Sequence, residues 1–162
     1  MTKKKKILYG LLVVLLIIQF IRPTKNSADT PSPNSIAKQY SVPVDVQKSL
    51  DIACMDCHSN NTTYPWYSNI QPVGWWLQKH VNDGKRHLNF SEFASYTPKK
   101  ANHKLEEVVE SQHEGWMPLD SYTWIHKDSK LTQQQKDAIV TWAQDVQQQI
   151  QTANPEVDYS SK

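Results

Sequence analysis

The pattern of apolar and polar positions divides the chain into parts of different character. Residues 7–21 are apolar apart from Gly10 and Gln19, and the run has no polar face. Residues 23–35 contain three Pro and no large apolar side chain, a composition typical of a flexible linker. Apolar residues with helical spacing return at residue 36. We therefore expect a signal-anchor segment (1–22), a linker (23–35), one folded domain (36–152) and a C-terminal tail (153–162).

Four segments of the domain place apolar residues three and four positions apart. This spacing is that of one face of an α-helix, and no segment alternates convincingly with period two. The predicted fold class is therefore all-α, with long Pro- and aromatic-rich connections. The predicted helices run from Pro43 into Cys54, from Gln71 to Gly84, from residue 100 to Gly115 and onward from Thr132, and the long connections are 59–72 and 115–130.

Local capping signals mark the ends of these helices. Gly84 and Gly115 each stand where a glycine commonly follows a helix C-terminus. Thr132 is followed at the third position by Gln135, the T-x-x-Q pattern of a capping box, with Leu131 before it as a hydrophobic staple. The helix after Thr132 is therefore the most clearly bounded of the four.

The net charge of +2 hides two opposite segments. Residues 1–30 carry six Lys or Arg against one Asp, whereas residues 31–162 carry twelve Lys or Arg against fifteen acidic residues. A basic nucleic-acid-binding face is therefore not expected on the domain. The four Gly residues cannot compose a dinucleotide- or phosphate-binding glycine motif, which excludes those classes as well.

The four Lys residues before the apolar run make residues 1–22 a targeting segment. Fifteen helical residues extend about 22 Å, less than the ~30 Å of a bilayer core, which favours a signal peptide. No small-residue cleavage site follows Arg22-Pro23, which favours an uncleaved anchor with snorkelling cations. We expect a single-pass anchor in the bacterial inner membrane, with Lys3 to Lys6 in the cytoplasm and the domain in the periplasm.

Both cysteines belong to the sequence Cys54-Met55-Asp56-Cys57-His58, the C-x-x-C-H pattern of haem c attachment. On a helical turn, positions i, i+3 and i+4 share a face, so two thiols and one imidazole point the same way. We expect Cys54 and Cys57 to form thioethers with one haem, and His58 to bind its iron as the proximal ligand.

Three other uses of the two cysteines remain open. A zinc site would need two further His, and no pair has the usual H-x₃₋₅-H spacing. A redox dithiol would be expected beside a βαβ pattern, which the sequence lacks. A disulfide between residues three apart on a helix would be strained and would close a negligible loop. The histidines available to a zinc site are His80, His87, His103, His113 and His126.

Met117 is the candidate for the second axial ligand of the iron. Met55 is too close to His58 to reach the opposite haem face, and Met1 lies outside the domain. A thioether is a soft ligand that raises the reduction potential of haem iron. The alternatives are His80, on the apolar stripe of its helix, and, more remotely, His126.

Aromatic residues near these motifs are expected to wall the haem and exclude water from it. A backbone carbonyl near Pro65 or Pro72 is the expected acceptor for the ring N–H of His58. The aromatic residues are Tyr64, Trp66, Tyr67, Trp75, Trp76 and Trp116.

The C-x-x-C-H motif followed by Met117-Pro118 resembles class I c-type cytochromes, in which that Met is the distal ligand and two helices cross beside the haem edge. The run from Cys54 to Phe93, the later GWMPLDSYTWIH and the helix through Trp142 are similar to a bacterial haem-binding domain family. This resemblance covers about residues 40–145. It implies a small cytochrome c-like helical domain around one haem.

A haem with two protein ligands has no open position for a substrate, and the sequence contains no recognisable catalytic triad or carboxylate pair. We therefore expect single-electron transfer between redox partner proteins rather than catalysis. A haem-based sensor or small-ligand-binding domain is the alternative, in which Met117 is weakly bound or absent from the iron. A peroxidase would normally need a second haem or a partner domain.

Overall fold

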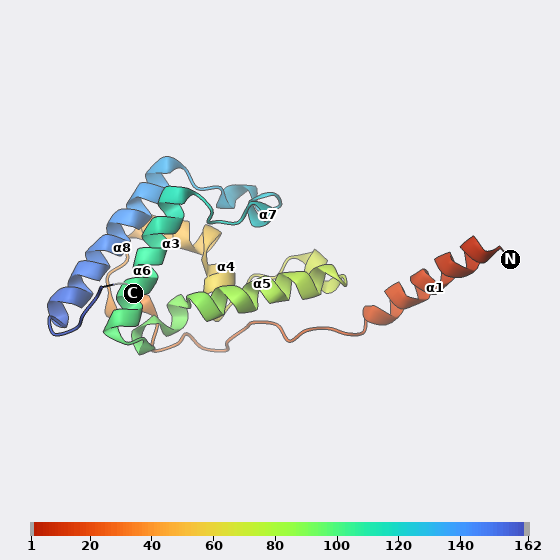
Figure 1. Cartoon of the computed structure of the whole chain (residues 1–162), viewed down its shortest axis with the longest axis horizontal. Helices are drawn as coiled ribbons and strands as arrows, with labels where there is room; N and C mark the ends of the chain where they lie inside the picture. The colour runs from red at the N-terminus through yellow and green to blue at the C-terminus, as the bar shows by residue number, and fades with distance from the viewer. Residues whose placement is uncertain (1, 161–162) are drawn as a thin grey trace.

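The computed structural model describes residues 2–160, and every regular element in that range is helical (Figure 1). The all-α fold class predicted from the sequence is confirmed. The longer helices are α1 (Lys3–Ile18), α3 (Val44–Ala53), α5 (Val73–His87), α6 (Pro98–Glu114) and α8 (Gln133–Ala153). The short elements are α2 (Ile36–Gln39), α4 (Met55–His58), α7 (Asp120–Thr123) and the 3₁₀ turns η1 (Trp66–Asn69), η2 (Phe90–Ser95) and η3 (Lys127–Ser129).

The core forms where α3 and α6 pack against α8 (Figure 1). Leu50 of α3, Leu105 of α6 and Ile139 of α8 are completely buried there. All three occupy positions on the apolar stripes of their helices, so the helical period of the sequence places the core residues. The indole N–H of Trp142 donates to the carbonyl of Ser41 at 3.1 Å, which fixes the segment before α3 against α8.

The predicted caps of the last two long helices are confirmed. Gly115 ends α6 in the left-handed region at φ 75° and ψ 20°, a conformation that L side chains rarely adopt. At the start of α8 the Thr132 hydroxyl accepts from the backbone of Gln135, and the Gln135 side chain accepts from the backbone of Thr132. Both ends are fixed by local chemistry, which explains why the sequence predicts them.

Gly84 does not end its helix, contrary to the prediction. It lies inside α5, which continues to His87. A Cβ atom at Gly84 would stand 2.7 Å from the carbonyl oxygen of Cys57 and 3.0 Å from its Cβ. The glycine therefore lets α5 approach the backbone of α4, so its role is a long-range contact and not a local helix stop.

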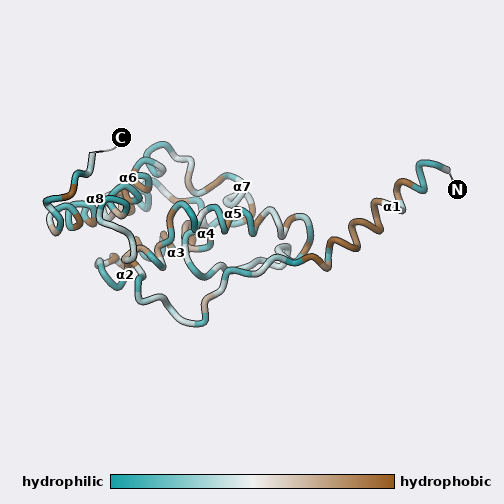
Figure 2. Tube along the Cα trace, turned by 60° about the horizontal axis from the view of Figure 1, so that its bottom comes forward, coloured by the Kyte–Doolittle hydropathy of each residue, from teal (hydrophilic) through white to brown (hydrophobic). Residues whose placement is uncertain are grey.

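The apolar run forms α1, whose axis leads away from the domain and most of whose residues are hydrophobic (Figures 1 and 2). Among the described residues, none of the helices combines the length and apolarity needed to span a bilayer. The end of this segment contacts the domain: the side chain of Gln19 donates to the carbonyl of Gln71 at 3.0 Å and accepts from its backbone N–H at 2.9 Å.

The segment predicted as a linker also contacts the domain. Asn26 is buried, its amide nitrogen donates to the carbonyl of Ser59 at 2.9 Å, and its amide oxygen accepts from Lys85 at 2.6 Å. Further along, Asn34 donates to the carboxylate of Glu92 at 3.0 Å. Pro-rich composition predicts an irregular path here, but it carries no signal for these amide contacts. The outermost residues of the predicted anchor and tail, 1 and 161–162, lie outside the described residues.

Candidate functional site

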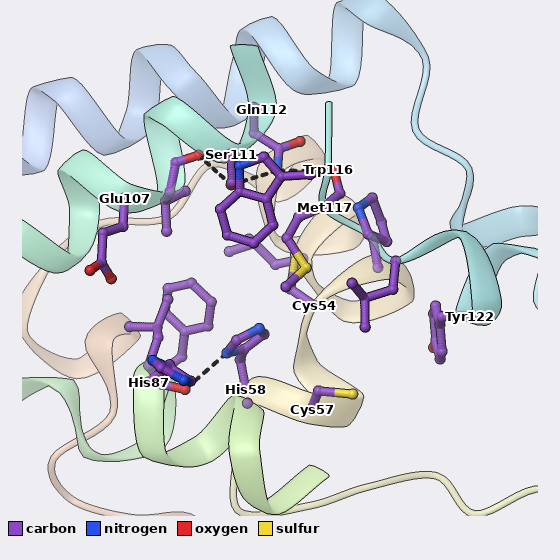
Figure 3. Close-up of a pocket in the computed structure, with 18 of the residues that line it drawn as sticks. Cys54, Cys57, His58, His87, Glu107, Ser111, Gln112, Trp116, Met117 and Tyr122 are labelled. Carbon is purple, nitrogen blue, oxygen red and sulfur yellow. Dashed lines mark hydrogen bonds between the residues drawn. The ribbon is translucent and has the colours of Figure 1, made fainter. Parts of the chain in front are cut away.

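A cavity of about 490 Å³ opens between the cysteine motif, α5, α6 and the loop after α6 (Figure 3). Its lining is mostly apolar, with polar groups from a few converging side chains. Its volume lies within the roughly 300–1,000 Å³ of cofactor and small-molecule sites. The residues predicted to attach or ligate a haem all contribute to its wall: Cys54, Cys57, His58, His80 and Met117. Of the six aromatic residues expected to wall the haem, Trp116 lines this cavity, whereas the prediction is wrong for Tyr64, Trp66, Tyr67, Trp75 and Trp76.

The turn after α3 presents the two cysteines and the histidine together. Cys54 leaves the helical conformation with φ −125° and ψ −43°, which ends α3 and allows α4 to begin in a new direction. The backbone N–H groups of Cys57 and His58 both donate to the carbonyl of Cys54, at 3.1 and 2.9 Å. One closed turn therefore directs these three side chains to one cavity, as the i, i+3, i+4 spacing predicts.

Both cysteines are unpaired thiols in the structure, so the disulfide alternative is not formed. Burial raises the pKa of the Cys54 thiol to about 12, and burial together with the Asp56 carboxylate raises the pKa of the Cys57 thiol to about 11. Both thiols are therefore neutral near pH 7 in the haem-free chain. A neutral thiol is a poor metal ligand, because the thiolate is the form that binds metals.

The imidazole of His58 is held by a hydrogen bond to the backbone of the segment after α5. Its Nδ1 lies 3.0 Å from the carbonyl oxygen of Leu88 (Figure 3). Burial lowers the pKa of His58, so the ring is neutral near pH 7. A neutral ring that donates from Nδ1 to a carbonyl keeps its Nε2 lone pair free for a metal.

The predicted acceptor near Pro65 or Pro72 is wrong, because the carbonyl of Leu88 takes that place. The end of α5 reaches His58 because Gly84 lets that helix pack directly on α4. Sequence proximity favoured the two prolines, whereas the actual acceptor stands 30 residues from His58.

Met117 is half-buried and enters the cavity from the loop after α6, together with Trp116; Figure 3 shows both above His58 in that view. The side chain of Gln112 supports this loop, since its Nε2 lies 3.5 Å from the carbonyl oxygen of Met117. Gln112 is only 6% exposed, and its Oε1 finds no hydrogen-bond partner among residues 2–160. In the sequence, the position of Gln112 on the apolar stripe of its helix indicates that its side chain is buried.

His80 also borders the cavity, from α5. Its Nδ1 lies 2.8 Å from the carbonyl oxygen of Trp76, and the two rings are 4.3 Å apart. The same histidine lines a second, smaller cavity of about 60 Å³ on the other side. His80 therefore stays an alternative to Met117, although one of its ring nitrogens is already engaged.

A set of polar aromatic residues contacts the cysteine turn, and Tyr122 of this set also lines the main cavity; the sequence gives no pattern that reveals the set. The hydroxyl of Tyr122 donates to the carboxylate of Asp56 at 2.7 Å, and the pKa of Tyr122 is raised by burial and by that carboxylate. The ring of Tyr122 stacks on His126 at 4.3 Å, and His126 Nε2 lies 3.0 Å from the hydroxyl of Tyr67. His126 is thus engaged beside the second cavity.

The residues of the main cavity suit a haem better than a bare metal ion. The donor set combines a neutral imidazole, two adjacent thiols and one thioether with an apolar wall, which are the groups that hold haem. The unpartnered Gln112 Oε1 leaves one hydrogen-bond acceptor available in a residue that lines the cavity. No group of three or more His, Cys, Asp or Glu side chains within residues 2–160 is arranged to hold a metal ion.

Comparison with known proteins agrees with this assignment. The family model described as a haem-binding domain matches residues 13–145, which includes the cysteine motif, the cavity and most of the core. No curated protein and no solved structure matches the chain. On this match, and with a cavity whose side chains fit the cofactor, the chain belongs to the haem-binding domain family.

Proposed function

We propose that this protein is a c-type cytochrome that carries single electrons between redox partner proteins. In this proposal Cys54 and Cys57 attach one haem covalently, His58 is the proximal ligand and Met117 the distal ligand. The observation that carries the proposal is that these four side chains border one cavity, with the His58 ring already fixed through Nδ1. The bound haem would supply a one-electron couple.

The surrounding residues would orient the ligands and exclude water. The carbonyl of Leu88 fixes the tautomer and the rotation of the His58 ring, so Nε2 needs little reorganisation to bind. The mostly apolar wall would limit the contact of water with a bound haem, and the Gln112 amide holds the backbone of the loop that carries Met117. A site preorganised in this way changes little between two oxidation states, which suits electron transfer.

Covalent attachment is tested by haem staining of a denaturing gel after expression with a haem-attachment system. The wild-type chain and Met55→Leu, a change within the same turn, should give a stained band. Cys54→Ser and Cys57→Ser should weaken the band, and the double variant should abolish it. An unstained wild-type chain would refute covalent attachment and leave non-covalent haem or the dithiol in its place.

The distal ligand is tested by carbon monoxide binding to the ferrous protein. The wild type should stay low-spin and resist carbon monoxide, whereas Met117→Ala should become high-spin and bind it readily. Met55→Ala is the control and should match the wild type. Ready binding by the wild type would instead support a sensor or small-ligand-binding domain, and an effect of His80→Ala alone would assign His80 as the distal ligand.

We also propose that α1 tethers the domain to the inner membrane, with the haem site in the periplasm. The proposal is supported by the apolar residues 7–18 of α1, interrupted only by Gly10, and by Lys3 to Lys6 at its N-terminal end. Protease added to intact spheroplasts should digest the domain while the chain sediments with membranes. A chain released by alkaline carbonate, or protected from the protease, would contradict this arrangement.

A further inference from the structure

One end of the domain exposes an unusual number of large apolar side chains. Trp66 is 76% exposed and Trp124 is 78% exposed, although tryptophan is normally well covered in a folded domain. We call this surface the aromatic end. It consists of Trp66, Ile70, Val73, Trp76, Trp124 and Ile125.

The aromatic end is built from three segments that lie close together. η1 packs against α5, and residues of η1, of α5 and of the segment after α7 share the lining of the smaller cavity, which includes both Trp76 and Ile125. The hydrogen bond between Tyr67 and His126 joins η1 to the residues after α7. An exposed apolar patch of this kind marks an interaction site.

The aromatic end is also the part of the domain to which the N-terminal helix is fixed. Gln19 and Gln71 exchange two hydrogen bonds, of 3.0 and 2.9 Å, and the indole N–H of Trp75 donates to the carbonyl of Ile21 at 2.7 Å. The domain lies beyond the C-terminal end of α1, with the start of α5 nearest to it (Figures 1 and 2). A bilayer that holds α1 therefore has its surface next to the aromatic end.

The short length of α1 brings the aromatic end still closer to the bilayer surface. Its 16 residues extend about 24 Å, short of the ~30 Å of a bilayer core. A short helix draws its flanking residues into the interface. Tryptophan is enriched at that depth, because its ring is apolar and its N–H still reaches water or headgroups.

We propose that the aromatic end docks on the headgroup region of the same bilayer that holds α1. This inference rests on the proposed tether. Docking would fix the orientation of the domain, and His80, which lines both cavities, would place the haem cavity one residue layer from the docked surface. The site would then serve redox partners that lie in or on the membrane rather than partners that diffuse freely.

The proposal is tested by photo-crosslinking in the full, haem-loaded chain. p-Benzoylphenylalanine replaces Trp66 in one variant, Trp124 in a second and Val44 in a control, because Val44 is 72% exposed at the start of α3, away from α1. None of the three residues lines the haem cavity, so all variants should keep the wild-type haem spectrum. Each variant is reconstituted in vesicles of phosphatidylethanolamine and phosphatidylglycerol and irradiated.

Mass spectrometry should find lipid adducts at positions 66 and 124 with a yield several-fold above that at position 44. Equal yields at the three positions, in a chain that floats with the vesicles, would overturn docking while leaving the tether intact. A chain that does not float would overturn the tether itself. The same variants are also irradiated in native membranes. Protein adducts without lipid adducts there would assign the aromatic end to a protein partner and also overturn the proposal.

Discussion

Replacing Gly84 with Ala tests the close approach of α5 to the cysteine turn. An added Cβ would stand 2.7 Å from the carbonyl oxygen and 3.2 Å from the carbonyl carbon of Cys57, and these are backbone atoms that cannot turn away. Overpacking of this kind costs about 1–3 kcal/mol. Alanine within a helix regains about 1 kcal/mol over glycine. We therefore expect Gly84→Ala to lower the free energy of unfolding by up to about 2 kcal/mol.

The measurement is urea unfolding of the haem-loaded chain, with the midpoint expected to fall and the slope to stay unchanged. Gly10→Ala is the matched control, because a Cβ at Gly10 meets nothing within 4 Å. The sign of the change in unfolding free energy decides whether α5 packs closely on Cys57. An increase in stability of about 1 kcal/mol, the gain from helix propensity alone, would refute the packing of α5 on Cys57.

Three further variants test the support of the site and the fold. Tyr122→Phe removes a hydrogen bond to the Asp56 carboxylate and should cost about 1.5 kcal/mol of unfolding free energy, with the haem spectrum shifted little, measured by urea unfolding and absorbance. Thr132→Ala removes the capping box of α8 and should cost about 1 kcal/mol, measured by the thermal midpoint. Glu92→Gln tests a pH effect: the hydrogen bond from Asn34 lowers the pKa of Glu92, so its contribution is present above the ordinary pKa of glutamate and lost as the pH falls below about 4. The variant should therefore be less stable than the wild type at pH 7 and should converge on it at pH 3.

A specific result would contradict each of these three expectations. A Tyr122→Phe variant as stable as the wild type would show that water replaces the hydroxyl without loss. Thr152→Ala, a change in the last turn of α8, is the control for Thr132→Ala, and equal losses of stability from the two would remove the cap as the cause. A constant difference between Glu92→Gln and the wild type from pH 7 to pH 3 would mean that the Glu92 charge does not contribute.

The sequence predicts features that depend on neighbours along the chain. The i, i+3, i+4 spacing of Cys54, Cys57 and His58 is a property of one helical turn, and the structure places all three on one cavity. Gly115 and Thr132 act through hydrogen bonds within a few residues. The helical period identifies the buried faces of α3, α6 and α8, because burial repeats with the turn of the helix.

Features that depend on distant segments could not be predicted. The buried amide of Asn26 finds its partners 33 and 59 residues away, and the backbone of Gln71 bonds to the side chain of Gln19, 52 residues away. Composition places both Asn26 and Gln71 among polar surface residues. Asn26 shows the consequence most clearly, because the Pro- and Ser-rich composition around it predicts a free linker. The family match, which begins at residue 13, also includes this segment.

The hydrogen bond from His58 to the carbonyl of Leu88 depends both on the local turn that holds the histidine and on the distant segment that supplies the carbonyl. It is a backbone carbonyl, so no substitution of the Leu88 side chain removes it, and its distance from the ring is set by where α5 ends. Gly84 controls that position through its contact with Cys57. A weaker hydrogen bond from Nδ1 lowers the basicity of the imidazole as an iron ligand and so favours the reduced form. Gly84→Ala should therefore raise the reduction potential of the haem-loaded protein with its axial ligands unchanged, whereas Gly10→Ala should leave the potential unaltered in a redox titration. If Gly84→Ala lowers the free energy of unfolding but leaves the reduction potential unchanged, Gly84 contributes to packing and does not control the hydrogen bond of His58.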